Sequence, residues 1–162
     1  LELSNEGNLA YQIVAVHYLP WQENPLAEDQ PLTIEVTYDA KTLKVDDALG
    51  VKVRLQYHRD EVADMTLVDL GIPPGFAVMP EYFQGLKDEG VIEKYSINGR
   101  QVTLYFREIN PERPVEFSYE LKAKFPVKAK TPKATAYQYY EPEIRAETQP
   151  VEIEVAKAAT LD

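Results

Sequence analysis

The sequence contains no cysteine and only two histidines, and these absences exclude several kinds of site. Without thiols there is no disulfide, no thiolate zinc site, no iron–sulfur cluster and no cysteine nucleophile. The two histidines, His17 and His58, lie far apart in the chain, so a histidine metal cluster or proton relay is not expected. We therefore predict no metal site and no cofactor.

Basic residues are also scarce: the 162 residues include 17 Lys and Arg and 27 Asp and Glu, which gives a net charge of -10. A nucleic-acid binder needs a basic face, so nucleic acid is not an expected partner. No apolar run is long enough for a transmembrane helix. No secretion signal stands at the N-terminus, so we expect it to be absent or already removed. A chain of this length is sufficient for a single domain with its own core.

What the sequence does contain is a series of short segments in which apolar and polar residues alternate, as in residues 32–38, 51–58, 115–125 and 151–155. A period of two is typical of a half-buried strand. Asn98-Gly99 tolerates the positive φ angles of a type I′ turn and predicts a hairpin. Further strands are expected at Tyr11–Leu19, Met65–Leu70, Val91–Ile97, Gln101–Arg107 and Ala134–Tyr140. Eight or nine such strands indicate an all-β fold, an antiparallel immunoglobulin-like β-sandwich.

One short helix is expected to interrupt the strands. Within residues 80–89, Tyr82, Phe83 and Leu86 recur at helical spacing. Pro80 suits the first helical position, and Gly90 suits the position just after the last turn. A helix of two to three turns is not stable alone in water, so it must pack on a sheet or cap one end of the sandwich.

The first 30 residues differ in composition from the rest. A single strand is followed by the acidic, proline-bounded stretch from Trp21 to Pro31, which has the composition of a linker. We interpret residues 1–22 as the last strand of a preceding domain or as an N-terminal extension, 23–30 as a linker and 31–162 as the main domain. The alternative is that the early strand is the first strand of the same sandwich, with a long connection.

No arrangement of residues typical of a catalytic centre is found, and the chain is not expected to be an enzyme. His58 lies on the polar side of its strand, and His17 shares a side with apolar residues, where a buried imidazole is the better interpretation. The acidic pairs Asp46-Asp47 and Asp88-Glu89 lack a calcium-binding loop pattern and are interpreted as solvated turns. Paired carboxylates for glycoside hydrolysis are an open alternative that no particular pair supports.

Two groups of residues are candidate interaction surfaces. The first is a possible basic docking stripe without any acidic residue between its ends; it consists of Lys122, Lys124, Lys128, Lys130 and Lys133. The alternative interpretation is that edge-strand lysines block unwanted sheet pairing. The second group is Tyr137, Tyr139 and Tyr140. If the strand continues through them, they cover both of its sides, so one side is packed and the other can serve a partner.

Three segments together resemble a known family. They are Asp69–Phe76 with the proline-led helix after it, the hairpin through Asn98-Gly99 into residues 102–106, and Ala136–Glu143, which contains a Tyr-x-Tyr-Tyr run. Their order and spacing resemble the C-terminal macroglobulin-like domain, or receptor-binding domain, of α2-macroglobulins, over about Pro31 to Val155. Residues 5–21 resemble the last strand of the CUB domain that precedes it. In its lack of cysteine, the sequence is more similar to the bacterial branch of this family than to the animal branch.

The resemblance implies a non-catalytic domain of a broad-range endopeptidase inhibitor, which traps proteases and often carries a thioester. In such proteins this domain packs on the thioester domain, and its aromatic residues keep water from the thioester. That role falls on Tyr137, Tyr139 and Tyr140. The implied partners are the thioester domain and other domains of a parent chain, and trapped proteases through the parent. The implied location is extracytoplasmic.

Receptor binding of the animal kind depends on two lysines in the helix region, whereas here Lys87 is the only lysine in the helix. An alternative function is an immunoglobulin-like binding module, either an adhesin repeat or a carbohydrate-binding domain, because rows of aromatic residues also bind sugars.

Overall fold

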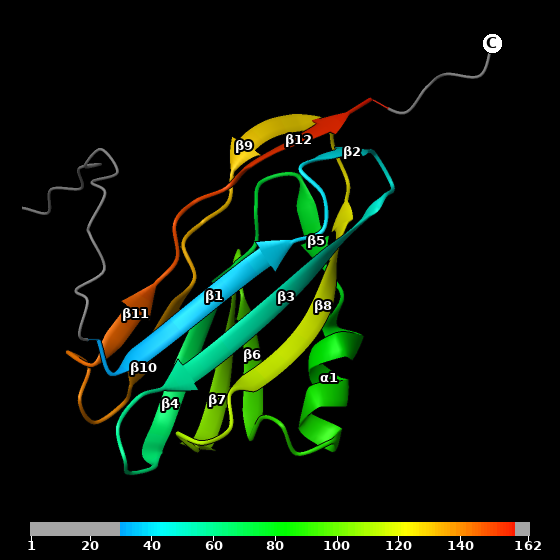
Figure 1. Cartoon of the computed structure of the whole chain (residues 1–162). Coiled ribbons are helices and arrows are strands. Elements are labelled where there is room, and N and C mark those ends of the chain that lie inside the picture. Colours follow the sequence, from blue (N-terminus) through cyan, green and yellow to red (C-terminus); the bar gives the residue numbers. More distant parts are fainter. Residues whose placement is uncertain (1–29, 158–162) are drawn as a thin grey trace, which may run out of the picture.

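The computed structural model describes residues 30–157, which form two packed sheets, a smaller third sheet and one helix (Figure 1). The four-stranded sheet has the order β1 (Leu32–Tyr38), β3 (Ala48–Tyr57), β8 (Val115–Ala123) and β5 (Phe76–Val78). The five-stranded sheet has the order β11 (Arg145–Glu147), β10 (Thr135–Gln138), β4 (Ala63–Gly71), β7 (Gln101–Ile109) and β6 (Lys94–Asn98). The three-stranded sheet has the order β2 (Thr42–Lys44), β12 (Glu152–Ala156) and β9 (Val127–Lys130).

The all-β sandwich predicted from alternation is confirmed. Strand β1 pairs with β3 antiparallel along its whole length, with Val36 opposite Val53. Strand β3 pairs in turn with β8, with Val53 opposite Phe117. All three side chains point inward, because residues opposite one another in an antiparallel pair share a face. Among the described strand pairs only β2 and β12 run parallel.

The core lies between the four-stranded and five-stranded sheets. Val53 and Leu55 from β3 and Leu104 from β7 are fully buried, and Phe106 and Leu121 are almost so. These side chains belong to one continuous cluster that also contains Ile153 and Val155 of β12. The three-stranded sheet therefore extends the same core at one end of the sandwich.

Helix α1 (Pro80–Asp88) begins at the predicted proline and ends in a Schellman motif. Gly90 has a φ of 72° and donates its N–H to the carbonyl of Lys87, while Val91 donates to the carbonyl of Leu86. A left-handed residue after the last turn is strained for most side chains, so glycine is favoured there. The predicted helix and its C-terminal glycine are confirmed.

Phe83 packs the helix against one strand of each main sheet. Its ring centroid lies 5.1 Å from that of Tyr119 on β8 and 5.9 Å from that of Tyr95 on β6. Phe83 itself is fully buried. The short helix thus obtains from tertiary packing the stability that it lacks alone.

The β6–β7 hairpin is confirmed, but its turn differs from the one predicted. Asn98 is still paired, opposite Gln101, so the two loop residues are Gly99 and Arg100. Gly99 has a φ of 58°, whereas Arg100 does not have a positive φ. A positive φ at the first loop residue alone is the pattern of a type II′ turn rather than type I′.

The predicted strand Tyr11–Leu19, His17 and the predicted boundary between residues 1–22 and the linker lie outside the described residues. Within residues 30–157, no helix combines the length and the apolar character that crossing a membrane requires.

Candidate docking face on the five-stranded sheet

The tyrosine run begins on β10 and continues past its end. The strand was predicted to reach Tyr140 but ends at Gln138, whose buried side chain points inward. The Tyr139 N–H donates to the carbonyl of Met65 at 2.8 Å. Met65 has an uncommon φ of 38° for a residue other than glycine. This backbone contact fixes Tyr139 beside β4.

Tyr139 and Tyr140 are both exposed, at 60% and 73% of their surface. Their rings meet edge to face, with centroids 5.1 Å apart and planes at 90°. From the sequence, we predict that the tyrosines cover both sides of the strand and that one side packs in the core. Instead the alternation stops at Gln138, because the chain bends there, and neither ring is buried.

Tyr137 belongs to a row of side chains that crosses the outer face of the five-stranded sheet. Its register neighbours are Arg145 on β11 and Leu67 on β4, and the row continues through Tyr105 on β7 to Lys94 on β6. Leu67 is only 6% exposed although it lies outside the core cluster. The Lys94 ammonium lies 5.4 Å from the centre of the Tyr105 ring. This outer row is therefore aromatic and apolar in its middle, with a cation at each end.

The next row on the same face is polar, and most of its polar side chains are hydrogen-bonded to one another. Thr103 donates a hydrogen bond to the Asp69 carboxylate at 2.7 Å. Burial raises the pKa of Tyr137, and the negative charge of Asp69 raises it further. Lys133, which precedes β10, donates to Glu147 of β11 at 3.1 Å, and Arg145 of β11 donates to Glu147 at 2.7 Å. The Lys133 hydrogen bond is the main cause that lowers the pKa of Glu147.

The carboxylates of this face are bonded to neighbouring side chains. Asp69 and Glu147 each accept hydrogen bonds from such side chains. Among residues 30–157, no group of three or more carboxylate or histidine side chains is placed to share a metal ion. His58 is exposed and shares a 3.0 Å hydrogen bond with Thr33. Asp47 accepts a hydrogen bond from the Lys44 N–H, as is usual in a turn.

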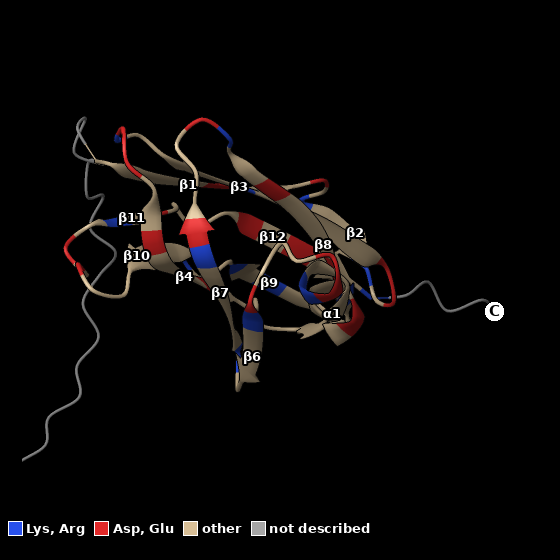
Figure 2. Cartoon of the chain, turned by 90° about the horizontal axis from the view of Figure 1, so that it is seen from below, with Lys and Arg blue, Asp and Glu red and all other residues tan. Residues whose placement is uncertain are grey.

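The lysine stripe is divided by acidic residues that are distant in sequence. Lys128 on β9 lies 3.3 Å from Glu152 and 4.0 Å from Glu154 on β12, and Lys133 is bonded to Glu147. Figure 2 shows the basic segments of β9 beside the acidic segments of β12. Lys122 lies on β8, and Lys124 and Lys130 are exposed. A docking role for this stripe stays a prediction.

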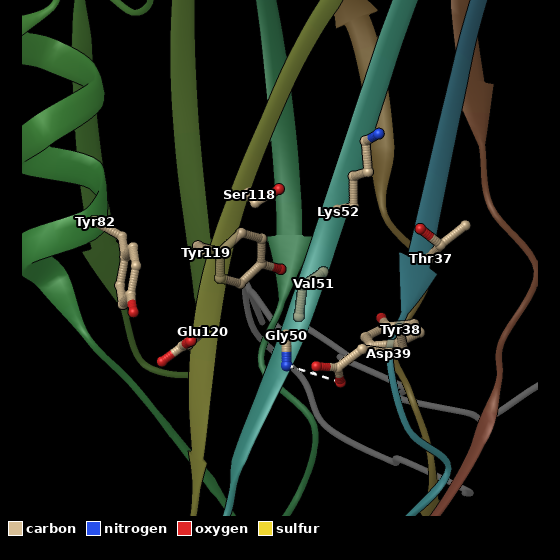
Figure 3. A pocket seen from close by; sticks show the side chains of 10 residues that line it. All are labelled: Thr37, Tyr38, Asp39, Gly50, Val51, Lys52, Tyr82, Ser118, Tyr119 and Glu120. Atoms are coloured by element: carbon tan, nitrogen blue, oxygen red, sulfur yellow. Dashed lines mark hydrogen bonds between the residues drawn. The ribbon is translucent and has the colours of Figure 1, made fainter.

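A hollow of about 390 Å³ lies on the outer side of the four-stranded sheet (Figure 3). Gly50 and Ser118 line it, and the Asp39 carboxylate, which accepts the Gly50 N–H at 3.0 Å, occupies the position that a Gly50 side chain would take. Tyr82 from α1 stands at one side, next to Glu120. Hydrogen bonding to the Glu120 carboxylate is the main cause that raises the pKa of Tyr82. Sequence reasoning did not predict this hollow, because it depends on which small residues neighbour each other across strands.

Comparisons with known proteins give a consistent result. The sequence profile of the A-macroglobulin receptor binding domain matches residues 61–150. Among curated proteins, none matches the sequence of this chain. The native conformation of Escherichia coli alpha-2-macroglobulin superposes with a TM-score of 0.69 at 17% identity, covering 83% of this chain and 10% of that one.

Two further solved structures share the fold. Salmonella alpha-2-macroglobulin reacted with methylamine gives a TM-score of 0.66 at 16% identity, over 82% of this chain and 10% of that one. Trypsin-activated alpha-2-macroglobulin from E. coli gives 0.61 at 18% identity, over 81% and 11%. The chain therefore spans about a tenth of the length of each of these three proteins.

Proposed function

This chain belongs to the A-macroglobulin receptor binding domain family, and from that premise we propose that it is the non-catalytic C-terminal domain of an alpha-2-macroglobulin-like endopeptidase inhibitor. Its role is to dock on the thioester domain of the parent chain and to keep water from the thioester. The chain has no cysteine, so the thioester belongs to another part of that parent.

The observation that carries this proposal is the exposed pair Tyr139 and Tyr140 at the end of β10. Two rings with most of their surface in water contribute little to the core, and large aromatic side chains on a surface are typical of binding sites. The edge-to-face contact and the backbone hydrogen bond to Met65 hold the pair in one place. A partner thus meets a prearranged aromatic surface, which lowers the entropy cost of binding.

The chemistry supports a shielding role. An acyl thioester is lost by attack of water, and rings packed over it exclude that water. Tyr137 extends the aromatic surface along the outer face of the sheet, beside Leu67 and Tyr105. These residues transfer no proton and form no bond to the thioester, so their contribution is a barrier rather than a catalytic step.

The protease partner and the location follow from the same family. A similar E. coli protein is activated by trypsin, which supports a protease as the partner of the parent protein. An inhibitor that meets foreign proteases acts outside the cytoplasm, so we propose an extracytoplasmic location. The lysine stripe, Lys122 and Lys124 in particular, is proposed only as an additional contact to other domains of the parent.

The test uses the parent protein with Tyr139→Ala, Tyr140→Ala or both. The fraction of thioester that still incorporates a fluorescent amine is followed over time. We expect the reactive fraction to decay at least about tenfold faster in the double variant. A factor of ten corresponds to a free-energy barrier to hydrolysis that is lower by about 1.4 kcal/mol. Phe125→Ala is the matched control, since Phe125 is 68% exposed but lies in the β8–β9 connection. Equal decay rates in all variants would remove the shielding role.

A sugar-binding module is the second candidate, supported by the same exposed tyrosines. A sugar stacks on an open ring face, and the edge-to-face contact of these rings covers one face of one ring and leaves the others to a ligand. A glycan array separates the two functions, because docking on a thioester domain predicts no glycan binding.

A further inference from the structure

Strand β8 has one edge that is only partly covered. Strand β3 pairs with it from end to end, but on the other side β5 reaches only Leu121–Ala123. The Ala123 N–H donates toward β3, to the carbonyl of Asp47, and the Lys124 N–H donates to the opposite side, to the carbonyl of Gly75. Backbone amides alternate between the two sides of a strand. On the edge of β8 that faces away from β3, the exposed N–H and carbonyl groups are therefore those of the even-numbered residues.

Three of those residues lie beyond the end of β5, at Glu116, Ser118 and Glu120. Within residues 30–157, no backbone hydrogen bond to the N–H or carbonyl groups of Glu116 and Ser118 is found on that side, whereas Glu120 adjoins the last pair with β5, Leu121 opposite Val78. Helix α1 stands beside this stretch (Figure 1), but a helix cannot supply strand hydrogen bonds. An unpaired strand edge is a template for an added strand.

A groove of about 410 Å³ separates α1 from this edge. Its apolar lining comes from Leu86 and Val91, and the strand side comes from Phe117 and Ser118. The groove shares Ser118 and Tyr82 with the hollow of Figure 3, which continues to Glu120. Tyr82 stands between the two, next to Glu120, so an extended peptide that follows β8 from Glu116 to Glu120 at about 3.3 Å per residue displaces the Tyr82 ring.

Gly85 keeps this groove open. A Cβ placed on Gly85 would meet no atom within 4 Å, and its φ is not positive. Glycine inside a helix costs about 0.5–1 kcal/mol relative to alanine. Neither packing nor backbone conformation requires glycine at this position. What its missing side chain does provide is access to the edge of β8.

The rim of the groove is acidic. Glu81 and Glu89 lie on its helix side and have no ion pair among the described residues. Glu116 lies on the strand side, where Arg54 and Lys52 partly neutralise it. The charge that complements this rim is positive. Residues 1–29 and 158–162 contain no lysine or arginine, so the undescribed segments of this chain do not supply it.

We propose that the groove between α1 and β8 is a docking site for an extended, lysine- or arginine-containing segment of a partner protein, which adds as a strand to the edge at Glu116–Glu120. Backbone hydrogen bonds supply affinity, and the glutamates select a basic sequence. The site lies on the helix side of the sandwich and is independent of the tyrosine surface at the end of β10.

The test titrates the ¹⁵N-labelled chain with an acetylated and amidated hexapeptide of alternating lysine and valine. We expect saturable shifts of the amide signals of Glu116, Ser118 and Glu120. A peptide in which glutamate replaces lysine is expected not to bind. A lysine–valine peptide N-methylated along one edge is expected to bind about tenfold more weakly, because it loses the strand hydrogen bonds.

Two variants of the chain complete the test. Gly85→Leu fills the groove and is expected to abolish binding while the melting temperature stays the same or rises. Lys87→Leu, on the same helix but not lining the groove, is the control and is expected to bind like the wild type. If Gly85→Leu does not fold, Glu89→Lys takes its place and is expected to weaken binding. The proposal is wrong if these amides show no saturable shift, if both peptides bind equally, or if the groove variants bind normally.

Discussion

Two aromatic contacts in this domain have the same ring spacing and opposite surroundings. Phe83 and Tyr119 have centroids 5.1 Å apart inside the sandwich, and Tyr139 and Tyr140 have the same separation on its surface. The first pair joins the helix to a sheet and is almost completely buried, while the second pair is mostly in water. Ring geometry alone therefore does not reveal a role. Burial indicates that the first contact supports the fold and leaves the second available for a partner.

The largest expected effect comes from the buried pair. Phe83→Ala removes a ring that contacts both Tyr119 and Tyr95, and it leaves a cavity. The free energy of unfolding is expected to fall by about 3–5 kcal/mol. Urea unfolding measures this value. A loss below about 1 kcal/mol would mean that the helix does not depend on this contact.

Two glycines sharpen the contrast between packed and open positions. At Gly71, a Cβ would lie 2.3 Å from the Cβ of Pro132, so Gly71→Ala is expected to destabilise the fold by about 1–3 kcal/mol. At Gly85 there is no neighbour within 4 Å, so Gly85→Ala is expected to stabilise it by about 0.5–1 kcal/mol. Thermal unfolding of the two variants in parallel shows the opposite signs. The same sign in both would contradict the packing described here.

The ion pairs on the five-stranded sheet predict a pH dependence. Lys133 and Arg145 hold the pKa of Glu147 below its usual value of 4.5. A lowered pKa in the folded state gives stability that is present above the unfolded pKa and is lost as the pH falls through the folded pKa. The wild type is therefore expected to exceed Glu147→Gln in stability at neutral pH, and the difference is expected to shrink below about pH 4.5.

Denaturant unfolding at a series of pH values between neutrality and acid measures that difference. Glu141→Gln is a suitable control, because Glu141 is exposed and has no ion pair among the described residues. A constant difference across the whole range would show that the Glu147 pairs do not contribute in this way.

The smallest expected effect on stability comes from the surface pair. Tyr139→Ala and Tyr140→Ala are each expected to change the free energy of unfolding of this chain by less than about 0.5 kcal/mol, because both rings are mostly solvated. The same urea experiment as for Phe83→Ala gives the comparison directly. A loss as large as that of Phe83→Ala would assign the surface rings to the fold instead of a partner.

The sequence predicted the elements that are encoded locally. Alternation predicted β1, β3 and β8, and the proline and glycine at the two ends of α1 predicted that helix, because each of these signals lies within a few residues. The strands β2, β5, β9 and β11 were not predicted, since each has only three or four residues and depends on pairing with distant segments. The parallel pairing of β2 with β12 is likewise invisible in either segment alone.

The surfaces were less predictable for the same reason. The tyrosine run was found, but its geometry was not, because the bend after Gln138 ends the alternation. The glutamates beside Lys128 and Lys133 come from β12 and β11, so the lysine stripe looked more uniform in sequence than it is in space. The burial of Leu67 on an outer face depends on Tyr137 and Tyr105 from two other strands.

The central claim is that the aromatic residues at the end of β10 serve a neighbouring domain. Hydroxyl-radical footprinting of the parent protein and of this chain alone tests it most directly. We expect Tyr139 and Tyr140 to be protected at least about tenfold in the parent, whereas the exposed Phe125 reacts alike in both. Equal modification of Tyr139 and Tyr140 in the two proteins would contradict it.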